Sequence, residues 1–373
     1  MKNMKVWDAI VLGGGVIGMS LARELRKQGA EVLVIDRGQP GREASYAAAG
    51  MLTPFGAHMP AILRPLASFS ARLFAEFVHE IEDESGKTVD LRAFGALVAE
   101  EELGEVAGAH KLDPAEMHAL EPCLGYRPGM HFASERSVDP RMLMAALLDA
   151  AKHRGIHIAH GSAVAEVSPE DGCLTVKSER TEYIAQVVVN CCGAWTATIG
   201  GGCQLLPVRP VKGQMLSLVA PHRDTLKHVV RTSEVYLVPR TDGRVLVGAT
   251  VEEAGFDKRV EPDRIQKLHQ LAANLVPDLG EARLLEAWAG LRPGTPDDLP
   301  VLGETDVAGY FVAAGHFRNG ILLAPVTAIA MASMMGGVAP SIDLGPFSPK
   351  RFAAQSAAPS GNAALDAPIR FAS

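Results

Sequence analysis

Three glycines near the start of the chain have the spacing of a phosphate-binding turn. Gly13, Gly15 and Gly18 fit the pattern G-x-G-x-x-G in the segment GGGVIG. In such a turn the first glycine permits the sharp bend, the second lets the backbone approach a pyrophosphate, and the third lets a helix pack closely on a strand. Asp36 follows where a carboxylate can accept hydrogen bonds from a ribose diol. These residues predict a dinucleotide site, which on this segment alone could hold FAD or NAD.

The residues around these glycines predict the strand–helix–strand unit that such a turn requires. An apolar run at residues 9–12 predicts a buried strand, and residues 32–35 predict a second. Between them, the apolar spacing from Met19 to Arg26 predicts a helix that ends at Gly29. The N-terminus of that helix would present free N–H groups and a partial positive charge to phosphates. The alternative, a glycine-rich loop that binds nothing, is disfavoured because all the parts occur in order.

A second glycine-rich turn occurs late in the chain. The segment GHFRNG at residues 315–320 precedes a long apolar run at residues 321–335, which predicts a helix. A second helix N-terminus could therefore face the same ligand and would stabilise negative charge on the pyrimidine ring of a reduced flavin.

The composition argues against several classes of partner. The chain has 373 residues, a formal net charge of −7 and no basic run, which argues against nucleic acid and anionic membrane surfaces. The N-terminus lacks the pattern of a signal peptide, and residues 321–335 are too short for the roughly 20 residues that span a bilayer. Five scattered cysteines are typical of reduced thiols. We therefore expect a cytoplasmic protein without a membrane span and without a metal site.

The order of the predicted elements indicates an α/β fold with a Rossmann-like dinucleotide-binding domain and a sheet-rich α+β domain, each discontinuous in sequence. An amphipathic helix at residues 63–82 opens an insertion, and strands at 285–291 and 310–314 are expected to return to the first domain. The dinucleotide-binding domain is predicted to comprise residues 1–59, 139–209 and 285–345. The second domain is predicted to comprise residues 60–138 and 210–284. The tail at residues 346–373 is rich in Ala, Ser, Pro and Gly, and we expect it to be disordered.

Several segments together resemble the D-amino-acid oxidase family of flavoenzymes, in matching order from about residue 5 to residue 340. The segments are VLGGGVIG, ASYAAAGML, VKGQ, YLVPR, GRVLVGAT, WAGLRPGTPD, PVLG and AAGHFRNGILLAP. Within the family, the resemblance is greatest to the branch that oxidises glycine for thiamine biosynthesis. The segment TPFGAHMP at residues 53–60 departs from the pattern of that branch.

The resemblance implies an enzyme with noncovalently bound FAD. Relatives with a covalent flavin use a cysteine after the RPGTPD-like segment, and no cysteine follows Cys203 here. The implied reaction is the oxidation of glycine, sarcosine or D-alanine by dioxygen to an oxoacid, ammonia and hydrogen peroxide, in a homotetramer. Two alternatives remain open: a dehydrogenase of the same fold that passes electrons to a quinone or carrier, and a non-catalytic flavin-binding subunit.

The resemblance also assigns roles to individual residues. Arg292 is implied to pair with the substrate carboxylate, Arg318 to contact the substrate, and Tyr236 to place a hydroxyl near the carboxylate. A guanidinium suits the first role because it forms a bidentate pair and keeps its proton. The alternatives are an interdomain ion pair for Arg292 and a half-buried strand tyrosine for Tyr236. The implied cofactor-binding residues are Gly13, Gly15, Val16, Ile17, Gly18, Asp36, Arg37, Ala44, Ser45, Ala49, Gly50, Met51, Val164, His316, Phe317, Arg318, Asn319, Gly320, Ile321 and Leu322.

Overall fold

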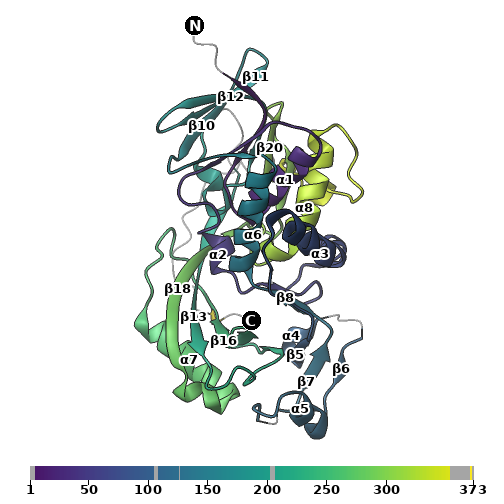
Figure 1. Cartoon of the computed structure of the whole chain (residues 1–373), viewed down its shortest axis with the longest axis vertical. Helices are drawn as coiled ribbons and strands as arrows, with labels where there is room; N and C mark the ends of the chain where they lie inside the picture. Colours follow the sequence, from purple (N-terminus) through teal and green to yellow (C-terminus); the bar gives the residue numbers. More distant parts are fainter. Residues whose placement is uncertain (1–4, 105–107, 126, 202–205, 353–369, 372–373) are drawn as a thin grey trace.

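The computed structural model describes residues 5–104, 108–125, 127–201, 206–352 and 370–371 (Figure 1). Two large sheets dominate this part of the chain. The first has the strand order β10-β11-β12-β1-β2-β9, with β20 beside β12 and β19 beside β20. The second has the order β18-β13-β16-β15-β14-β5-β7-β6. In Figure 1 the first sheet and its helices lie above the second sheet, and this arrangement confirms the predicted α/β class with two sheet-centred parts.

The predicted dinucleotide unit is present. Strand β1 (Val6–Leu12) leads into α1 (Val16–Lys27) and then into β2 (Val32–Asp36), which is parallel to β1. Strand β12 (Glu182–Asn190) is parallel to β1 on its other side. Gly29 follows the end of α1 with a φ of +94°, the left-handed conformation expected of a glycine after a helix. The spacing of apolar residues therefore located these elements to within a few residues.

Four helices pack together against the first sheet. They are α1, α3 (Arg64–Ser85), α6 (Pro140–His153) and α8 (Gly320–Met335), and their apolar faces belong to one buried cluster. The Ser70 hydroxyl in α3 donates to the carbonyl of Leu322 in α8 at 2.6 Å. The expectation that residues 60–138 leave the first domain is therefore wrong for α3. Helical periodicity indicates which face is apolar but does not identify its packing partner.

Strand β18 (Arg283–Gly294) corrects a second expectation. It pairs antiparallel with β13 (Arg209–Val219) along almost its whole length, from Arg283 opposite Val219 to Gly294 opposite Arg209. Residues 285–294 therefore belong to the second sheet and do not return to the first. Helix α7 (Pro262–Leu275) covers one face of this sheet through Leu268 and its apolar neighbours. The opposite face of the second sheet lies toward the first sheet and its helices.

The remaining strands complete the sheets. The first sheet also contains β9 (His157–His160), β10 (Val164–Glu170), β11 (Cys173–Ser178), β19 (Val301–Glu304) and β20 (Tyr310–Ala314). The second also contains β5 (Ala96–Ala99), β6 (His110–Lys111), β7 (Met130–Ala133), β14 (Val229–Arg231), β15 (Tyr236–Pro239) and β16 (Arg244–Gly248). A small sheet contains β3 (Met51–Leu52), β4 (Leu91–Arg92) and β8 (Arg136–Val138). The short helices are α2 (Ala44–Ala47), α4 (Glu100–Leu103) and α5 (Pro114–Leu120).

The C-terminal region is partly ordered, unlike the predicted tail. Short 3-10 turns occur at Gly345–Phe347 and Pro349–Phe352. Strand β21 (Arg370–Phe371) pairs with β17 (Thr250–Val251). The prediction of disorder for residues 353–369 and 372–373 lies outside the described residues. Within the described ranges, no helix combines the length and the apolar character needed to cross a bilayer.

Candidate active site

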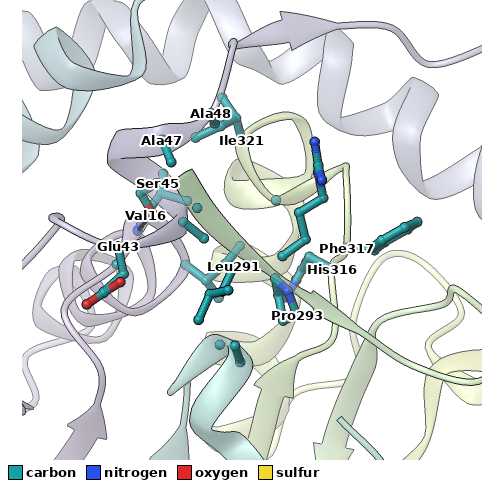
Figure 2. A pocket seen from close by; sticks show the side chains of 18 of the residues that line it. Val16, Glu43, Ser45, Ala47, Ala48, Leu291, Pro293, His316, Phe317 and Ile321 are labelled. Atoms are coloured by element: carbon teal, nitrogen blue, oxygen red, sulfur yellow. Dashed lines mark hydrogen bonds between the residues drawn. The ribbon is translucent and has the colours of Figure 1, made fainter. Parts of the chain in front are cut away.

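A cavity of about 810 Å³ lies between the two sheets. Its volume falls in the range of roughly 300–1,000 Å³ that is typical of cofactor and ligand sites. Figure 2 shows Val16 and Ser45 on one side of it, and Leu291 of β18 with His316 and Phe317 on another. The cavity therefore collects the N-terminal ends of α1 and α8 and the inner face of the second sheet.

The predicted phosphate-binding turn lines this cavity. Gly13 has a φ of +96°, and a Cβ added there would lie 2.5 Å from the carbonyl oxygen of Cys191, so only glycine fits. The N-cap residue of α1 is Gly15, which has no side chain, and the Val16 N–H at the start of α1 donates to Ser45 Oγ at 2.9 Å. Gly18 does not line the cavity. A Cβ added at Gly18 would lie 2.0 Å from the carbonyl oxygen of Gly13, so the helix and the turn approach too closely for a larger residue. Gly18 thus holds the helix against the turn, as predicted for the third glycine.

Asp36, Arg37 and Val164 lie at one end of the cavity. The Asp36 carboxylate accepts a hydrogen bond from Gly14 N–H at 2.7 Å, which fixes it beside the glycine turn. The Arg37 guanidinium lies 4.5 Å from the ring centroid of Trp195, and that ring stacks on Phe256 with centroids 5.4 Å apart. Trp195 and Phe256 also line the cavity and had no role assigned from the sequence. They come from segments far apart in the chain, so sequence spacing could not pair them.

Small residues form a wall of the cavity. Ala44, Ala49, Gly50 and Met51 line it along with Ser45, as the resemblance implies. Gly50 has a φ of +76°, and a Cβ there would lie 2.0 Å from the carbonyl oxygen of Val138. Short side chains at this wall leave space for a flat ring.

The segment before α8 supplies the second helix N-terminus. Asn319, the N-cap residue of α8, makes no side-chain cap hydrogen bond, and Asn319, Gly320 and Ile321 line the cavity, so the N-terminal end of α8 lies at the cavity wall. Phe317 has a φ of +48° and donates its N–H to the carbonyl of Pro293 at 3.0 Å, which ties this turn to β18.

Two further residues of this segment lie deeper. His316 is fully buried, and its Nε2 lies 3.1 Å from Thr327 Oγ1. Burial lowers the pKa of His316 to about 3, so the imidazole is neutral at physiological pH. Leu322 packs in the core below the cavity and does not line it. Of the sequence-derived site residues, Gly18 and Leu322 are therefore the two that the cavity does not include.

Arg292, Arg318 and Tyr236 meet at the end of the cavity that faces the second sheet. Arg292 Nη1 donates to the carbonyl of Thr250 at 3.1 Å. Burial lowers the pKa of Arg318, and the neighbouring charge of Arg292 lowers it further. Burial raises the pKa of the Tyr236 phenol, and the positive charges of both arginines oppose that rise. A carboxylate bound between the two guanidinium groups would relieve their mutual repulsion.

Two glycines make this arrangement possible and were not assigned a role from the sequence. A Cβ added at Gly213 of β13 would lie 2.2 Å from Arg292 Nη1. One added at Gly248 of β16 would lie 2.5 Å from Tyr236 Oη. A glycine inside a predicted strand signals a close approach by another group. The glycines at positions 213 and 248 therefore indicated a close approach, but a glycine does not identify which side chain approaches it.

The features of the cavity fit a flavin dinucleotide. The N-terminal ends of two helices line it, glycines leave space for a pyrophosphate, and a wall of small residues can lie against a planar ring. Among the described residues, no cluster of His, Cys, Asp and Glu could hold a metal ion.

The chain matches the family model described as DAO, FAD dependent oxidoreductase, over residues 8–334. It is 33% identical over 364 residues to the glycine oxidase of Geobacillus kaustophilus, which covers 92% of this chain and 96% of that relative. It is 35% identical over 346 residues to the bifunctional protein ThiO/ThiG of a Nostoc species, covering 88% of this chain. The chain spans about half, 52%, of the length of that bifunctional relative. The crystal structure of the G. kaustophilus glycine oxidase matches with a TM-score of 0.85 at 32% identity, covering 92% of this chain and 98% of that one.

Proposed function

The chain belongs to the DAO family of FAD-dependent oxidoreductases, and on that premise we propose that it oxidises glycine and other small amino acids, such as sarcosine and D-alanine. Water hydrolyses the imine, so the products are an oxoacid, hydrogen peroxide and an amine, which is ammonia from glycine or D-alanine and methylamine from sarcosine, with dioxygen as the final electron acceptor. Bound FAD supplies the two-electron acceptor for the hydrogen on the α carbon. The observation that carries the proposal is the group formed by Arg292, Arg318 and Tyr236 at one end of the dinucleotide-shaped cavity.

Residues along one cavity would hold FAD. The turn at Gly13 and Gly15, with the start of α1, would bind the pyrophosphate, and Asp36 would accept hydrogen bonds from the adenosine ribose. The start of α8 at Asn319 and Gly320 presents N–H groups to the pyrimidine edge of the ring. Its partial positive charge favours the negatively charged, reduced form.

The substrate is held by its carboxylate. Arg292 offers a bidentate pair, and the carbonyl of Thr250 holds its guanidinium in place. Fixing the carboxylate aligns the α C–H bond with the ring, and this alignment is the main requirement of hydride transfer. The neutral His316 and the protonated Tyr236 add no competing charge there.

The substrate range is tested with a panel of glycine, sarcosine and D-alanine, measuring peroxide and ammonia. We expect stoichiometric peroxide and ammonia with glycine. Electron transfer only to artificial acceptors, with no peroxide, would indicate a dehydrogenase instead.

The role of Arg292 is tested with R292A. Removing one partner of a desolvated charge pair costs about 3–5 kcal/mol, which corresponds to a KM raised roughly 100- to 4,000-fold. The flavin absorbance spectrum of the purified variant checks that FAD is still bound. An unchanged KM for glycine would remove the assigned role.

We further propose that the enzyme is a cytoplasmic homotetramer whose product feeds thiamine thiazole synthesis. The glycine oxidase and ThiO/ThiG relatives support the link to thiamine synthesis. Light scattering of the purified holoenzyme tests the oligomeric state, and a mass other than that of four chains would contradict it.

A further inference from the structure

A third arginine lies in the same cavity, next to the proposed substrate site. Arg231 ends β14 and is directly opposite Tyr236 of β15 in the antiparallel pairing. Residues opposite each other in such a pair lie on the same face of the sheet, with Cβ atoms about 4.5–5.5 Å apart. Arg231 is 5% exposed and lines the cavity together with Tyr236 and Arg292. Its guanidinium therefore lies on the substrate side of the second sheet.

The hydrogen-bonding capacity of Arg231 is only partly used. Its Nη2 donates to Glu135 Oε1 at 2.9 Å, and both side chains are buried. Within the part of the chain that the structure describes, Arg231 Nε and Glu135 Oε2 have no hydrogen-bond partner. A guanidinium carries five N–H donors, and leaving donors unsatisfied in a buried site is costly. Nε is enclosed by the protein, whereas Nη1 is not among the enclosed atoms and lies beside Gly56 of the cavity wall, so Nη1 is the donor that a ligand oxygen in the cavity could reach.

The loop above Arg231 is the segment that departs from the glycine-oxidising branch. A Cβ added at Gly56 would lie 3.6 Å from Arg231 Nη1. Residues 56–60 also line the cavity, and His58 Nε2 lies 3.2 Å from a Glu102 carboxylate oxygen. The segment that departs from that branch therefore lies next to Arg231 in the cavity.

Three guanidinium groups and three carboxylates lie at or near this end of the cavity, so a second anion would be held by free hydrogen-bond donors and not by surplus charge. Arg231, Arg292 and Arg318 contribute three guanidinium groups. Glu135 is paired with Arg231, whereas Glu102 and Asp298 act on Arg318. One substrate carboxylate between Arg292 and Arg318 leaves the free donors of Arg231 without an acceptor.

We propose that Arg231 determines specificity by binding a second carboxylate of the substrate, so that the enzyme takes amino acids with two carboxylates. The second carboxylate is carried either on the substituent of the α carbon or on the substituent of the nitrogen. This inference rests on the proposed oxidation of amino acids at this site, whose chemistry it leaves unchanged.

Kinetics with matched substrate pairs test the inference. Iminodiacetate and sarcosine differ by a carboxylate on the nitrogen substituent, and D-aspartate and D-alanine differ by one on the α-carbon substituent. We expect kcat/KM to be at least tenfold higher for the dicarboxylic member of at least one pair, and the responsive pair identifies the position. If neither pair shows this preference, the inference is wrong.

Two variants assign the preference to Arg231. The double variant R231Q/E135Q removes both buried charges together, so no unpaired ion is left in the core. We expect its dicarboxylic-to-monocarboxylic ratio of kcat/KM to fall at least tenfold. The control E135Q keeps Arg231 and should keep or increase the ratio. A ratio that is unaffected in the double variant would overturn the assignment.

A binding measurement separates this inference from the proposed reaction. Malonate and acetate are titrated into the holoenzyme while the flavin absorbance is followed. We expect malonate to bind at least tenfold more tightly than acetate to the wild-type protein but not to R231Q/E135Q. If no amino acid is oxidised but this difference is present, the proposed function fails and the role of Arg231 stands. If glycine is oxidised and malonate has no advantage, the role of Arg231 fails alone.

Discussion

Gly213 and Gly248 leave the space that the side chains of Arg292 and Tyr236 occupy. Both glycines lie in strands of the second sheet, in β13 and β16, and their missing Cβ atoms face the cavity side. The position of the Arg292 guanidinium, which we propose binds the substrate, is thus set as much by an absent methyl group as by its hydrogen bond to the Thr250 carbonyl. At the scale of single residues, the testable property is the space that these two glycines leave for the neighbouring side chains.

Replacing Gly213 with alanine should displace the guanidinium of Arg292. The new Cβ would lie 2.2 Å from Arg292 Nη1, so the side chain must move away from the carbonyl of Thr250. A small misplacement of a positioning group can cost on the order of 100-fold in rate. We expect kcat/KM for glycine to fall by at least tenfold, measured from peroxide production.

The matched control is G280A. A Cβ at Gly280 would lie 3.6 Å from Ala273 Cβ, an ordinary contact in a region outside the cavity. This variant should retain the wild-type kcat/KM. Equal activity of G213A and G280A would show that the guanidinium does not depend on the space at Gly213.

At the scale of elements, an ion cluster joins three helices of the first half. Arg23 of α1 and Arg154, which follows α6, both bind the Glu84 carboxylate of α3, with the Nε atoms 2.7 and 2.8 Å from Oε2. Burial by itself would raise the pKa of Glu84, but the hydrogen bonds from the two arginines outweigh it and hold the pKa at about 2. The cluster connects α3 to the first sheet's helices, which the sequence-based domain boundary did not anticipate.

The variant E84Q tests the contribution of this cluster to stability. The pKa of Glu84 is lower in the folded protein, at about 2, than its ordinary value of 4.5, so its contribution is complete above pH 4.5. It is lost as the pH falls from 4.5 toward 2. From the size of the shift we expect E84Q to lower the free energy of unfolding by on the order of 3 kcal/mol at pH 7.

Urea unfolding at pH 7 and pH 3.5 measures this difference. The gap between wild type and E84Q should narrow at the lower pH, whereas E76Q, at an exposed position of the same helix, should match the wild type at both. A gap that stays constant with pH would mean that the carboxylate charge is not what stabilises the helices.

Local pattern predicted most elements but not their partners. The strand–helix–strand unit from β1 to β2 and the helix α8 could be located because apolar spacing and glycines are local signals. The packing of α3 on α8 and the pairing of β18 with β13 depend on contacts between distant segments. Arg231 illustrates the same limit within the site, because its place opposite Tyr236 follows from strand register. Arg292 was found through resemblance to a family, which carries such long-range information.

At the scale of the whole molecule, the cavity is closed by contacts between segments on its two sides. Trp195 lies in the turn after β12 of the first sheet, and Phe256 lies in the loop after β17, beyond the second sheet. Their rings stack with an interplanar angle of 29°, and Arg37 lies over Trp195. The stack therefore covers the end of the cavity at which Asp36 would bind the adenosine ribose.

Removing the Phe256 ring should weaken the retention of FAD. An aromatic pair contributes about 0.5–1.5 kcal/mol beyond the burial of its surface, so F256A should raise the Kd of the apoprotein for FAD by roughly 2- to 13-fold. Quenching of flavin fluorescence during titration of apoprotein measures this Kd. Phe94 provides the control, because it is also 47% exposed but does not line the cavity. F94A should bind FAD as the wild type does, whereas an equal Kd for both variants would mean that the stack lies over the cavity without holding the cofactor.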